Sequence, residues 1–337
     1  MNATMSLENL KHYPVMLDQV LSIISPQHGG TFIDCNFGGG GYSNAILKFP
    51  GTKVIAIDRD KITKKYSDKL EKEFPERFNF IQEKFSNLNN IIKKNIKPKA
   101  IIFDLGLSTL QLLDKERGFS FHSKDFLNME MGMNEHSAYD IVNYLDKGYL
   151  ATIIKVLGDE KDGKIIANKI DRYRKKKKIQ SSQELALIIR SAKKNYNSYK
   201  KNPATKTFQA IRIFINKELT ELIQGLISAT KILSEDGLLI VISFHSIEDK
   251  IVKNFFNIYS NLKKNPSRYL PIKENIPSIF KSISKKPLIA NSDEVKKNIN
   301  SRSAKLRFAV KNESPVVNFN DFEKKFANYL ILEKNKI

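Results

Sequence analysis

The chain has 337 residues, 41% of them hydrophobic, which is enough to bury a large core and to form two domains or one domain with an insertion. Its 57 lysines and arginines exceed 36 acidic residues, and the formal net charge of +21 favours a polyanionic partner such as nucleic acid. A single cysteine excludes an internal disulfide, and no apolar run approaches the ~20 residues of a membrane span. Because residues 1–11 carry no secretory or import pattern, we expect a cytoplasmic protein without a membrane role.

The first chemical signal is a glycine-rich loop. The apolar run over residues 31–34 ends in Asp34 and is soon followed by four consecutive glycines, Gly38 to Gly41. Glycines weaken helices and strands, so we expect a loop whose backbone lies against a ligand. A second apolar run, 53–58, ends in Asp58 roughly 20 residues after the loop, a spacing that suits an acid holding a ribose. The alternative is a glycine-rich surface turn without a ligand.

Two nucleoside-binding classes share this order of strand, glycine loop, helix, strand and acid. They are the dinucleotide oxidoreductases and the methyltransferases that use S-adenosylmethionine. A dinucleotide loop requires G-x-G-x-x-G, but counting from Gly38 leads to Gly40 and then Ser43, so the third glycine is missing. We therefore favour the methyl donor, with its carboxylate at the start of the helix that follows.

Further strands extend the pattern. Residues 78–81 predict a third strand leading to Phe85, whose ring is a candidate for flanking an adenine. Residues 99–103 predict a fourth, which ends in Asp104. Each strand-end acid could cap the next helix, but in a parallel sheet the carboxyl ends share one edge. Three acids at that edge indicate an active site.

The sheet pattern stops after about residue 108, and helical segments follow to residue 201. We expect an inserted domain here. Its densest charge run, residues 172–178, reads Arg-Tyr-Arg-Lys-Lys-Lys-Lys. This run is either a solvated helix end or a phosphate-binding surface, and the sequence does not decide between them.

Sheet-type elements are expected to return after Pro203. Residues 205–230 predict one long helix, and residues 237–242 predict a fifth strand that ends in a polar cluster containing His245. A histidine here is either hydrogen-bonded structure or part of a site. Residues 263–300, rich in Lys, Ser and Pro, predict a mobile basic loop before a final strand at 301–310.

These motifs together resemble the RsmH (MraW) family, S-adenosylmethionine-dependent methyltransferases acting on N4 of a cytidine in small-subunit (16S) ribosomal RNA. The matching segments are residues 12–15, 34–43, 58–60, 104–106, 116–121, 203–210, 243–246 and 301–307. The resemblance implies an α/β fold: a class I, Rossmann-like methyltransferase sheet with an inserted helical substrate-recognition domain. We accordingly expect methyltransferase parts at 1–108 and 203–337 around an insertion at 109–202.

The resemblance also implies the cofactor contacts and the partner. The cofactor is S-adenosylmethionine, and the partner is 16S rRNA in the small subunit or its assembly intermediate. Tyr42 stands where the family usually has His, so only a backbone contact would survive there; Asn128 and Glu130 also depart from the family pattern. The implied cofactor contacts are Gly40, Gly41, Tyr42, Asp58, Phe85, Asp104 and Gln111.

Methylation of a cytosine amine sets its own requirements. The N4 lone pair is delocalised into the ring, so positioning and an acceptor for the N–H bonds supply much of the catalysis. Asp104 and Ser108 are candidate acceptors, and His245 is a candidate for orienting the base. We expect no metal. Alternatives are a different nucleic-acid amino-methyltransferase, although Leu105-Gly106-Leu107 is not the Pro-Pro-aromatic motif of the DNA enzymes, or a non-catalytic RNA-binding assembly factor.

Overall fold

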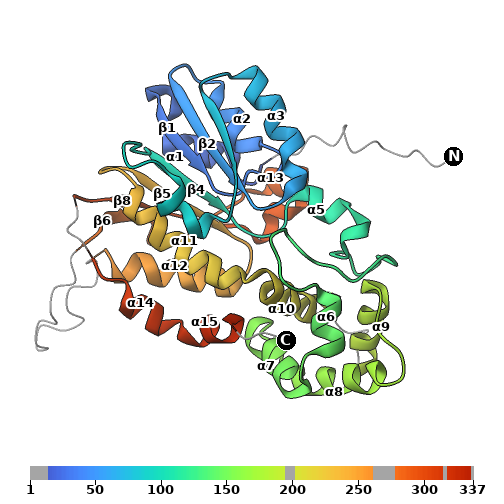
Figure 1. The fold of residues 1–337 in the computed structure, drawn as a ribbon. Coiled ribbons are helices and arrows are strands. Elements are labelled where there is room, and N and C mark those ends of the chain that lie inside the picture. The colour runs from blue at the N-terminus through green and yellow to red at the C-terminus, as the bar shows by residue number, and fades with distance from the viewer. Residues whose placement is uncertain (1–13, 194–201, 261–277, 314–316, 335–337) are drawn as a thin grey trace, which may run out of the picture. The chain divides into compact units, whose positions relative to one another are not determined.

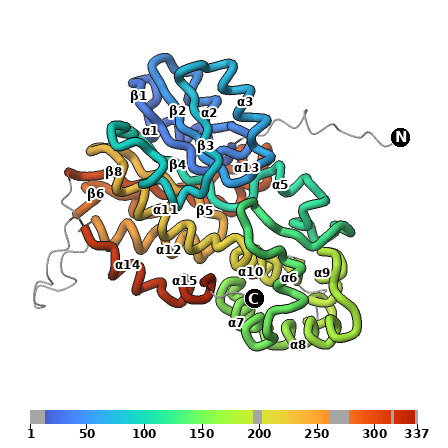
Figure 2. Tube along the Cα trace, in the orientation of Figure 1, coloured from blue at the N-terminus to red at the C-terminus, as the bar shows by residue number. Residues whose placement is uncertain are grey.

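The computed structural model describes residues 14–193, 202–260, 278–313 and 317–334. They form a mixed α/β protein, whose chain can be followed in Figures 1 and 2. The chain divides into two compact units, one comprising residues 1–106 and 225–319 and the other residues 107–224 and 320–337. No helix in the described part of the chain is long and apolar enough to cross a membrane.

The first unit is built on one sheet with strand order β3-β2-β1-β4-β5-β8-β6, in which β7 also pairs with β8. All the pairings among β1 to β5 are parallel, whereas β8 runs antiparallel to β5, β6 and β7. This confirms the predicted class I methyltransferase sheet. The strands are β1 (Gly30–Asp34), β2 (Thr52–Asp58), β3 (Phe78–Gln82), β4 (Ala100–Asp104), β5 (Leu238–Ser243), β6 (Phe280–Ile283), β7 (Leu288–Ile289) and β8 (Lys305–Lys311).

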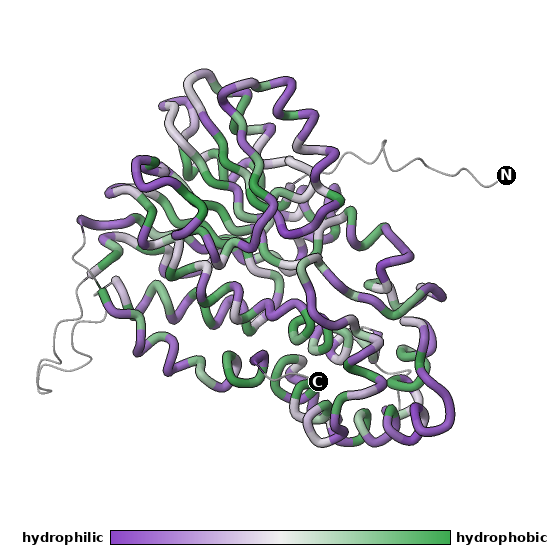
Figure 3. Tube along the Cα trace, viewed as in Figure 1, coloured by the Kyte–Doolittle hydropathy of each residue, from purple (hydrophilic) through white to green (hydrophobic). Residues whose placement is uncertain are grey.

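The central strands are mainly apolar before the polar residues at their carboxyl ends, as expected of strands that helices cover. Ile101, Ile102 and Phe103 of β4 are fully buried, as expected of a parallel strand shielded on both faces. Figure 3 shows the strands as mainly hydrophobic and the surrounding helices as mixed. The helices of this unit are α1 (Leu17–Ile24), α2 (Gly41–Leu47), α3 (Lys64–Glu73), α4 (Leu88–Ile91), α12 (Ser246–Ile258), α13 (Ser292–Lys297) and most of α11 (Glu218–Ile232).

The second unit is helical in its described part. Three of its helices begin at side-chain caps: Ser137, Asp146 and Ser181 each accept a backbone N–H of the first turn of α6, α7 and α9, respectively. The helices are α5 (Thr109–Leu113), α6 (Ala138–Tyr144), α7 (Lys147–Leu157), α8 (Gly163–Arg174), α9 (Ser182–Ala192), α10 (Thr205–Asn216), α14 (Asn320–Lys325) and α15 (Ala327–Lys334).

Three expectations need correction. The long helix predicted over residues 205–230 is two helices, because Lys217 adopts a left-handed φ of 51° that ends α10 before α11 begins. The sheet unit resumes at residue 225 rather than 203, since α10 packs on helices of the second unit, with Phe214 against Tyr149 of α7. Finally, residues 278–300 of the expected mobile loop contain β6, β7 and α13; the rest of that loop, up to residue 277, lies outside the described residues.

Candidate active site

The three strand-end acids lie at one edge of the sheet. In the parallel register Asp34 pairs with Ala56 of β2 and Ile102 of β4, so Asp58 and Asp104 each lie two residues beyond it towards the carboxyl end. The negative charge of Asp34 raises the pKa of both neighbours, which shows that the three carboxylates share one electrostatic environment. The predicted convergence of acids is therefore present.

Asp58 is held by the glycine loop. Its Oδ2 accepts the N–H of Gly38 at 2.8 Å, and its Oδ1 accepts the N–H of Asp60 at 2.9 Å. Burial raises its pKa to about 6, and the charges of Asp60 and Asp34 add to the rise, while the two N–H donors oppose it. Each carboxylate oxygen has a further lone pair, so this fixed side chain can still accept ribose hydroxyls.

Asp104 is the most unusual of the three acids. Its Oδ1 is enclosed by protein, and among the described residues no donor reaches it. Burial, followed by the charges of Asp34 and Glu248, raises its pKa well above the ordinary range of a carboxyl group. A buried polar atom without a partner costs free energy, so its retention points to a donor or a cation supplied by a ligand.

Asp34, by contrast, is tied into the loop. It is fully buried, and its carboxylate accepts the Ser43 hydroxyl at 2.7 Å and the Asn36 N–H at 3.3 Å. Burial raises its pKa to about 6, although these hydrogen bonds lower it. The sequence placed Asp34 at the sheet edge but did not reveal its hydrogen bond to Ser43, which ties the glycine loop to α2. The only hint in the sequence was a serine nine residues after this acid.

The structure explains Gly40 and Gly41 by packing within the protein, whereas the sequence suggested contact with a ligand. A Cβ on Gly40, where φ is +79°, would lie 2.8 Å from the Phe37 ring, and a Cβ on Gly41 would collide with Pro14. The protein's own side chains therefore demand these two glycines, and a ligand need not be invoked. Tyr42 is also part of the core: it is 3% exposed and donates its hydroxyl to the Val15 carbonyl, leaving its backbone for any cofactor contact.

Phe85 lies in a short turn after β3. Its ring meets Phe103 edge to face, with centroids 5.1 Å apart, and it packs so closely on Gly225 that a Cβ there would lie 2.6 Å from it. The position is fixed by packing. The ring is only partly buried, so part of it remains free for another contact.

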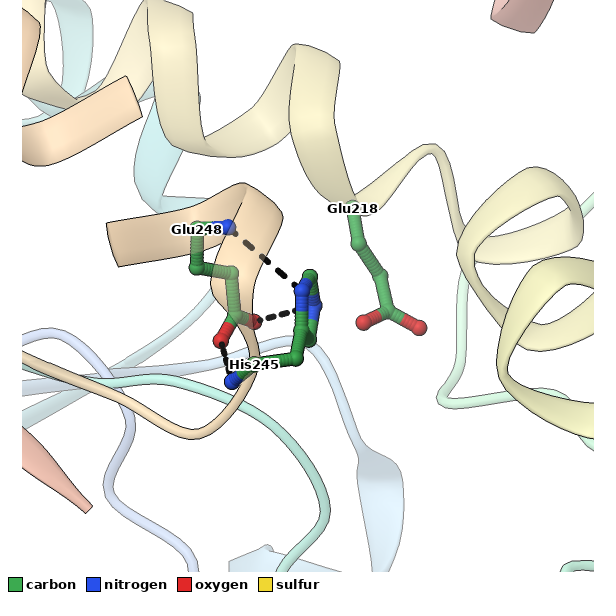
Figure 4. Close-up of side chains that lie close together, drawn as sticks. All are labelled: Glu218, His245 and Glu248. Atoms are coloured by element: carbon green, nitrogen blue, oxygen red, sulfur yellow. Dashed lines mark hydrogen bonds and ion pairs between the residues drawn. The ribbon is translucent and has the colours of Figure 1, made fainter. Parts of the chain in front are cut away.

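His245 is the N-cap residue that precedes α12, and it is bound to Glu248, as Figure 4 shows. Its Nδ1 accepts the Glu248 N–H at 3.4 Å, and its Nε2 lies 3.1 Å from the Glu248 carboxylate. The same carboxylate accepts the N–H groups of Phe244 and His245 at 2.9 and 3.2 Å. Because Nδ1 is an acceptor, a neutral His245 carries its proton on Nε2. Sequence reasoning missed Glu248, although an acid three residues into a helix is a typical capping signal.

Two predicted residues belong to the second unit. Ser108 and Gln111 form a capping box at the start of α5: Ser108 Oγ accepts the Gln111 N–H at 3.2 Å, and Gln111 Oε1 accepts the Ser108 N–H at 3.1 Å. Each side chain therefore has a structural role in its own unit.

The comparisons with known proteins agree with the fold. The chain matches the MraW methylase family over residues 9–312. Proteins named "Ribosomal RNA small subunit methyltransferase H" are 38% identical in Parvibaculum lavamentivorans, covering 91% of each chain, and 42% identical in Rickettsia prowazekii, covering 89% of this chain and 98% of that protein. The counterpart from a Wolbachia strain is 43% identical over 88% of this chain and 98% of its own.

A crystal structure of an rRNA methylase from Streptococcus thermophilus aligns with 87% of this chain and 96% of its own, at 9% identity and a TM-score of 0.38. That likeness is too weak to add to the assignment. The family match over residues 9–312 and the relatives at about 40% identity are sufficient to assign the family. The chain belongs to the MraW methylase family, whose methyl donor is S-adenosylmethionine.

Proposed function

We propose that this protein methylates N4 of a cytidine in the decoding region of small-subunit (16S) rRNA. The observation that carries the proposal is the buried Oδ1 of Asp104, for which the described residues supply no donor, in a chain of the MraW methylase family. A cytosine N4 amine offers two N–H donors. The rRNA methyltransferase names of relatives at about 40% identity and the net charge of +21 support an RNA substrate.

The residues of the sheet edge fit S-adenosylmethionine, which supplies a methyl group on a positively charged sulfur. Buried carboxylates that have no lysine or arginine partner stabilise such a positive charge, because the low dielectric constant of the site strengthens their attraction to it. Asp58, fixed by Gly38 and Asp60, accepts the ribose hydroxyls, and Phe85 flanks the adenine. The backbone of Gly40, Gly41 and Tyr42 and the side chain of Gln111 complete the proposed cofactor contacts.

Asp104 then acts on the substrate. Its Oδ1 accepts an N–H of the cytosine amine and so orients the nitrogen lone pair towards the methyl group. Bound S-adenosylmethionine would supply the methyl group and leave as the neutral thioether once its C–S bond breaks, and Asp104 would take the proton that the methylated nitrogen releases. Its high pKa makes it a better base than an ordinary carboxylate. We assign His245 to orienting the base and Ser108 to a secondary acceptor role.

The test is transfer of a labelled methyl group to small-subunit particles that lack the modification, followed by digestion and nucleoside mapping. The expected product is one N4-methylated cytidine in the decoding region. Label at another nucleoside would identify a different nucleic-acid methyltransferase. A protein that binds the particles without S-adenosylmethionine affinity would be an assembly factor.

A further inference from the structure

The second unit carries a row of aromatic rings on its surface, which we name the aromatic row: Phe126, Tyr139 and Tyr144. The Tyr139 ring lies 5.2 Å from Phe126 and 6.0 Å from Tyr144, centroid to centroid. Phe126 is 51% exposed and Tyr144 is 54% exposed. Large aromatic side chains that gather at the surface instead of in the core mark a contact site.

A cation adjoins this row. Lys178 Nζ lies 4.1 Å from the centroid of the Tyr144 ring, and Lys178 ends the basic run that begins at Arg172. The run carries six cations, of which Arg174 and Lys175 pair with Asp171 and Lys177 with Glu184. A hydrogen bond with Tyr144, burial and the nearby negative charge of Asp140 raise the pKa of Tyr139, so one acid also lies close to the row. The local balance nevertheless remains positive.

The backbone beneath the row is rigidly held. Residue 127 donates its N–H to the Gln180 carbonyl and accepts the Tyr139 N–H, both at 2.8 Å. The buried Asn143 side chain donates to the Ile179 carbonyl at 2.9 Å and accepts the Ile179 N–H at 3.0 Å. Three segments distant in sequence are thus locked together, so the rings are preorganised for a partner.

Two further residues fix the same surface. Gly118, with φ of +69°, lies so close to the backbone that a Cβ would come within 2.8 Å of the Phe126 carbonyl oxygen. Arg174 donates to the Val142 and Leu145 carbonyls at 3.0 and 2.7 Å, and its side chain is only 11% exposed. Arg174 therefore holds the basic run against α6, although its sequence position suggested a phosphate contact.

We propose that the aromatic row is a platform on which unpaired RNA bases stack, while the basic run, Arg172 to Lys178 without Arg174, binds the neighbouring phosphates. This rests on the proposed rRNA substrate and names the surface of the second unit that engages it. Single-stranded nucleic acid is bound by this pairing of aromatic rings with a basic track, since every base offers a flat face. A protein partner would need an apolar patch, whereas this surface is flanked by cations.

The chain contains no tryptophan, which permits a direct test. Tyr144→Trp introduces a single indole into the row, and an unpaired oligoribonucleotide of roughly 12 residues serves as the probe. Stacking of a base should quench the indole fluorescence. Ile331→Trp is the matched control, because Ile331 on α15 is 62% exposed and lies outside the row; its fluorescence should not change.

Affinity measurements complete the test. Tyr144→Leu and Phe126→Ala should each weaken oligonucleotide binding by about 5- to 150-fold, whereas Tyr144→Phe, which retains the ring, should stay within about twofold of the parent. Lys176→Gln should lower the slope of log affinity against log salt by about 0.7. S-adenosylmethionine affinity should be the same in all these variants.

The outcomes separate this proposal from the proposed function. If the parent methylates small-subunit particles while Tyr144→Leu and Phe126→Ala bind the oligonucleotide as tightly as the parent, the platform is wrong and the methyltransferase assignment stands. Loss of particle binding with unchanged oligonucleotide affinity would assign the row to a ribosomal protein and also overturn the proposal. A parent that binds the oligonucleotide but transfers no methyl group would refute the proposed function alone.

Discussion

The three acids at the edge of the sheet differ from two paired acids of the helical unit. In the helical unit, Glu160 lies 2.5 Å from Lys193, with both side chains less than a tenth exposed, and Glu218 pairs with Arg212 at 2.8 Å. At the edge of the sheet, Asp34, Asp58 and Asp104 pair with no lysine or arginine of the described chain. Removing the cation of a buried paired acid leaves an uncompensated charge and destabilises the fold, whereas acids kept without a cation in a buried site are suited to a cationic ligand.

The largest expected effect is on catalysis by Asp104. Asp104→Asn keeps the shape of the side chain but removes its charge and its ability to accept a proton. Turnover should fall by about 10²- to 10⁴-fold, whereas S-adenosylmethionine affinity should change by less than about tenfold. Methyl-transfer kinetics and calorimetry measure the two quantities. Equal losses in both would make Asp104 only a binding residue.

The opposite behaviour is expected for a paired acid. Lys193→Met leaves Glu160 buried without its cation and should destabilise the fold by about 3–5 kcal/mol in denaturant unfolding. Lys206→Met is the control, because its 3.8 Å pair with Asp159 is exposed and should contribute less than about 1 kcal/mol. Equal effects of the two variants would remove the distinction between buried and exposed pairs.

Asp58 should affect cofactor binding. Asp58→Ala removes the acceptor for the ribose hydroxyls and should weaken S-adenosylmethionine binding by about 1.5–3 kcal/mol, the range for hydrogen bonds to charged groups. Asp68→Ala is a suitable control, since Asp68 is half exposed and pairs with Lys64 on the outside of α3. A folded Asp58→Ala protein with parental affinity would contradict the assignment.

The sequence predicted the sheet and its acids because both depend on local patterns. Apolar runs ending in Asp34, Asp58 and Asp104 fix the strands, and a parallel sheet brings their ends to one edge. It could not predict that Gly41 accommodates Pro14, because this contact joins segments distant in the chain, nor that the Phe37 ring folds back onto Gly40 within the loop. Nor could it show that Arg174 is structural, since a basic run looks the same whether its members bind phosphates or carbonyl groups.

One acid of the helical unit, Glu333, differs from the paired acids Glu160 and Glu218 because backbone N–H groups hold it in place of a cation. Glu333 is 1% exposed and accepts the N–H groups of Leu219 and Thr220 at 3.2 and 2.8 Å, at the start of α11. Burial nevertheless raises its pKa from 4.5 to about 8. The folded protein thus holds this proton more tightly than the unfolded chain does, so its contribution to stability is full below pH 4.5 and is lost as the pH rises to about 8.

Glu333→Gln cannot ionise, and its amide keeps an oxygen acceptor for only one of the two N–H groups, because different carboxylate oxygens accept them in the parent. The free energy of unfolding of the variant should therefore fall less than that of the parent between pH 5 and pH 8, by on the order of 3 kcal/mol. Denaturant titrations at several pH values measure this difference. Parallel pH profiles would show that Glu333 is ionised in the fold and is stabilised by the helix N-terminus instead.

The central claim is that the acids at the sheet edge, which have no lysine or arginine partner, serve a cationic ligand. Its most direct test is to count the protons released when S-adenosylmethionine binds. Asp58, with a pKa raised by burial to about 6, is partly protonated at pH 6, and burial also raises the pKa of Asp104, which favours its protonated form; a bound cation favours the ionised form of both. Calorimetry at pH 6 in buffers of different ionisation enthalpy should show net proton release when S-adenosylmethionine binds. The release should be smaller with S-adenosylhomocysteine, which lacks the sulfonium charge. It should also be smaller when S-adenosylmethionine binds the Asp104→Asn variant. Equal proton release with both ligands, or proton uptake with S-adenosylmethionine, would contradict the account.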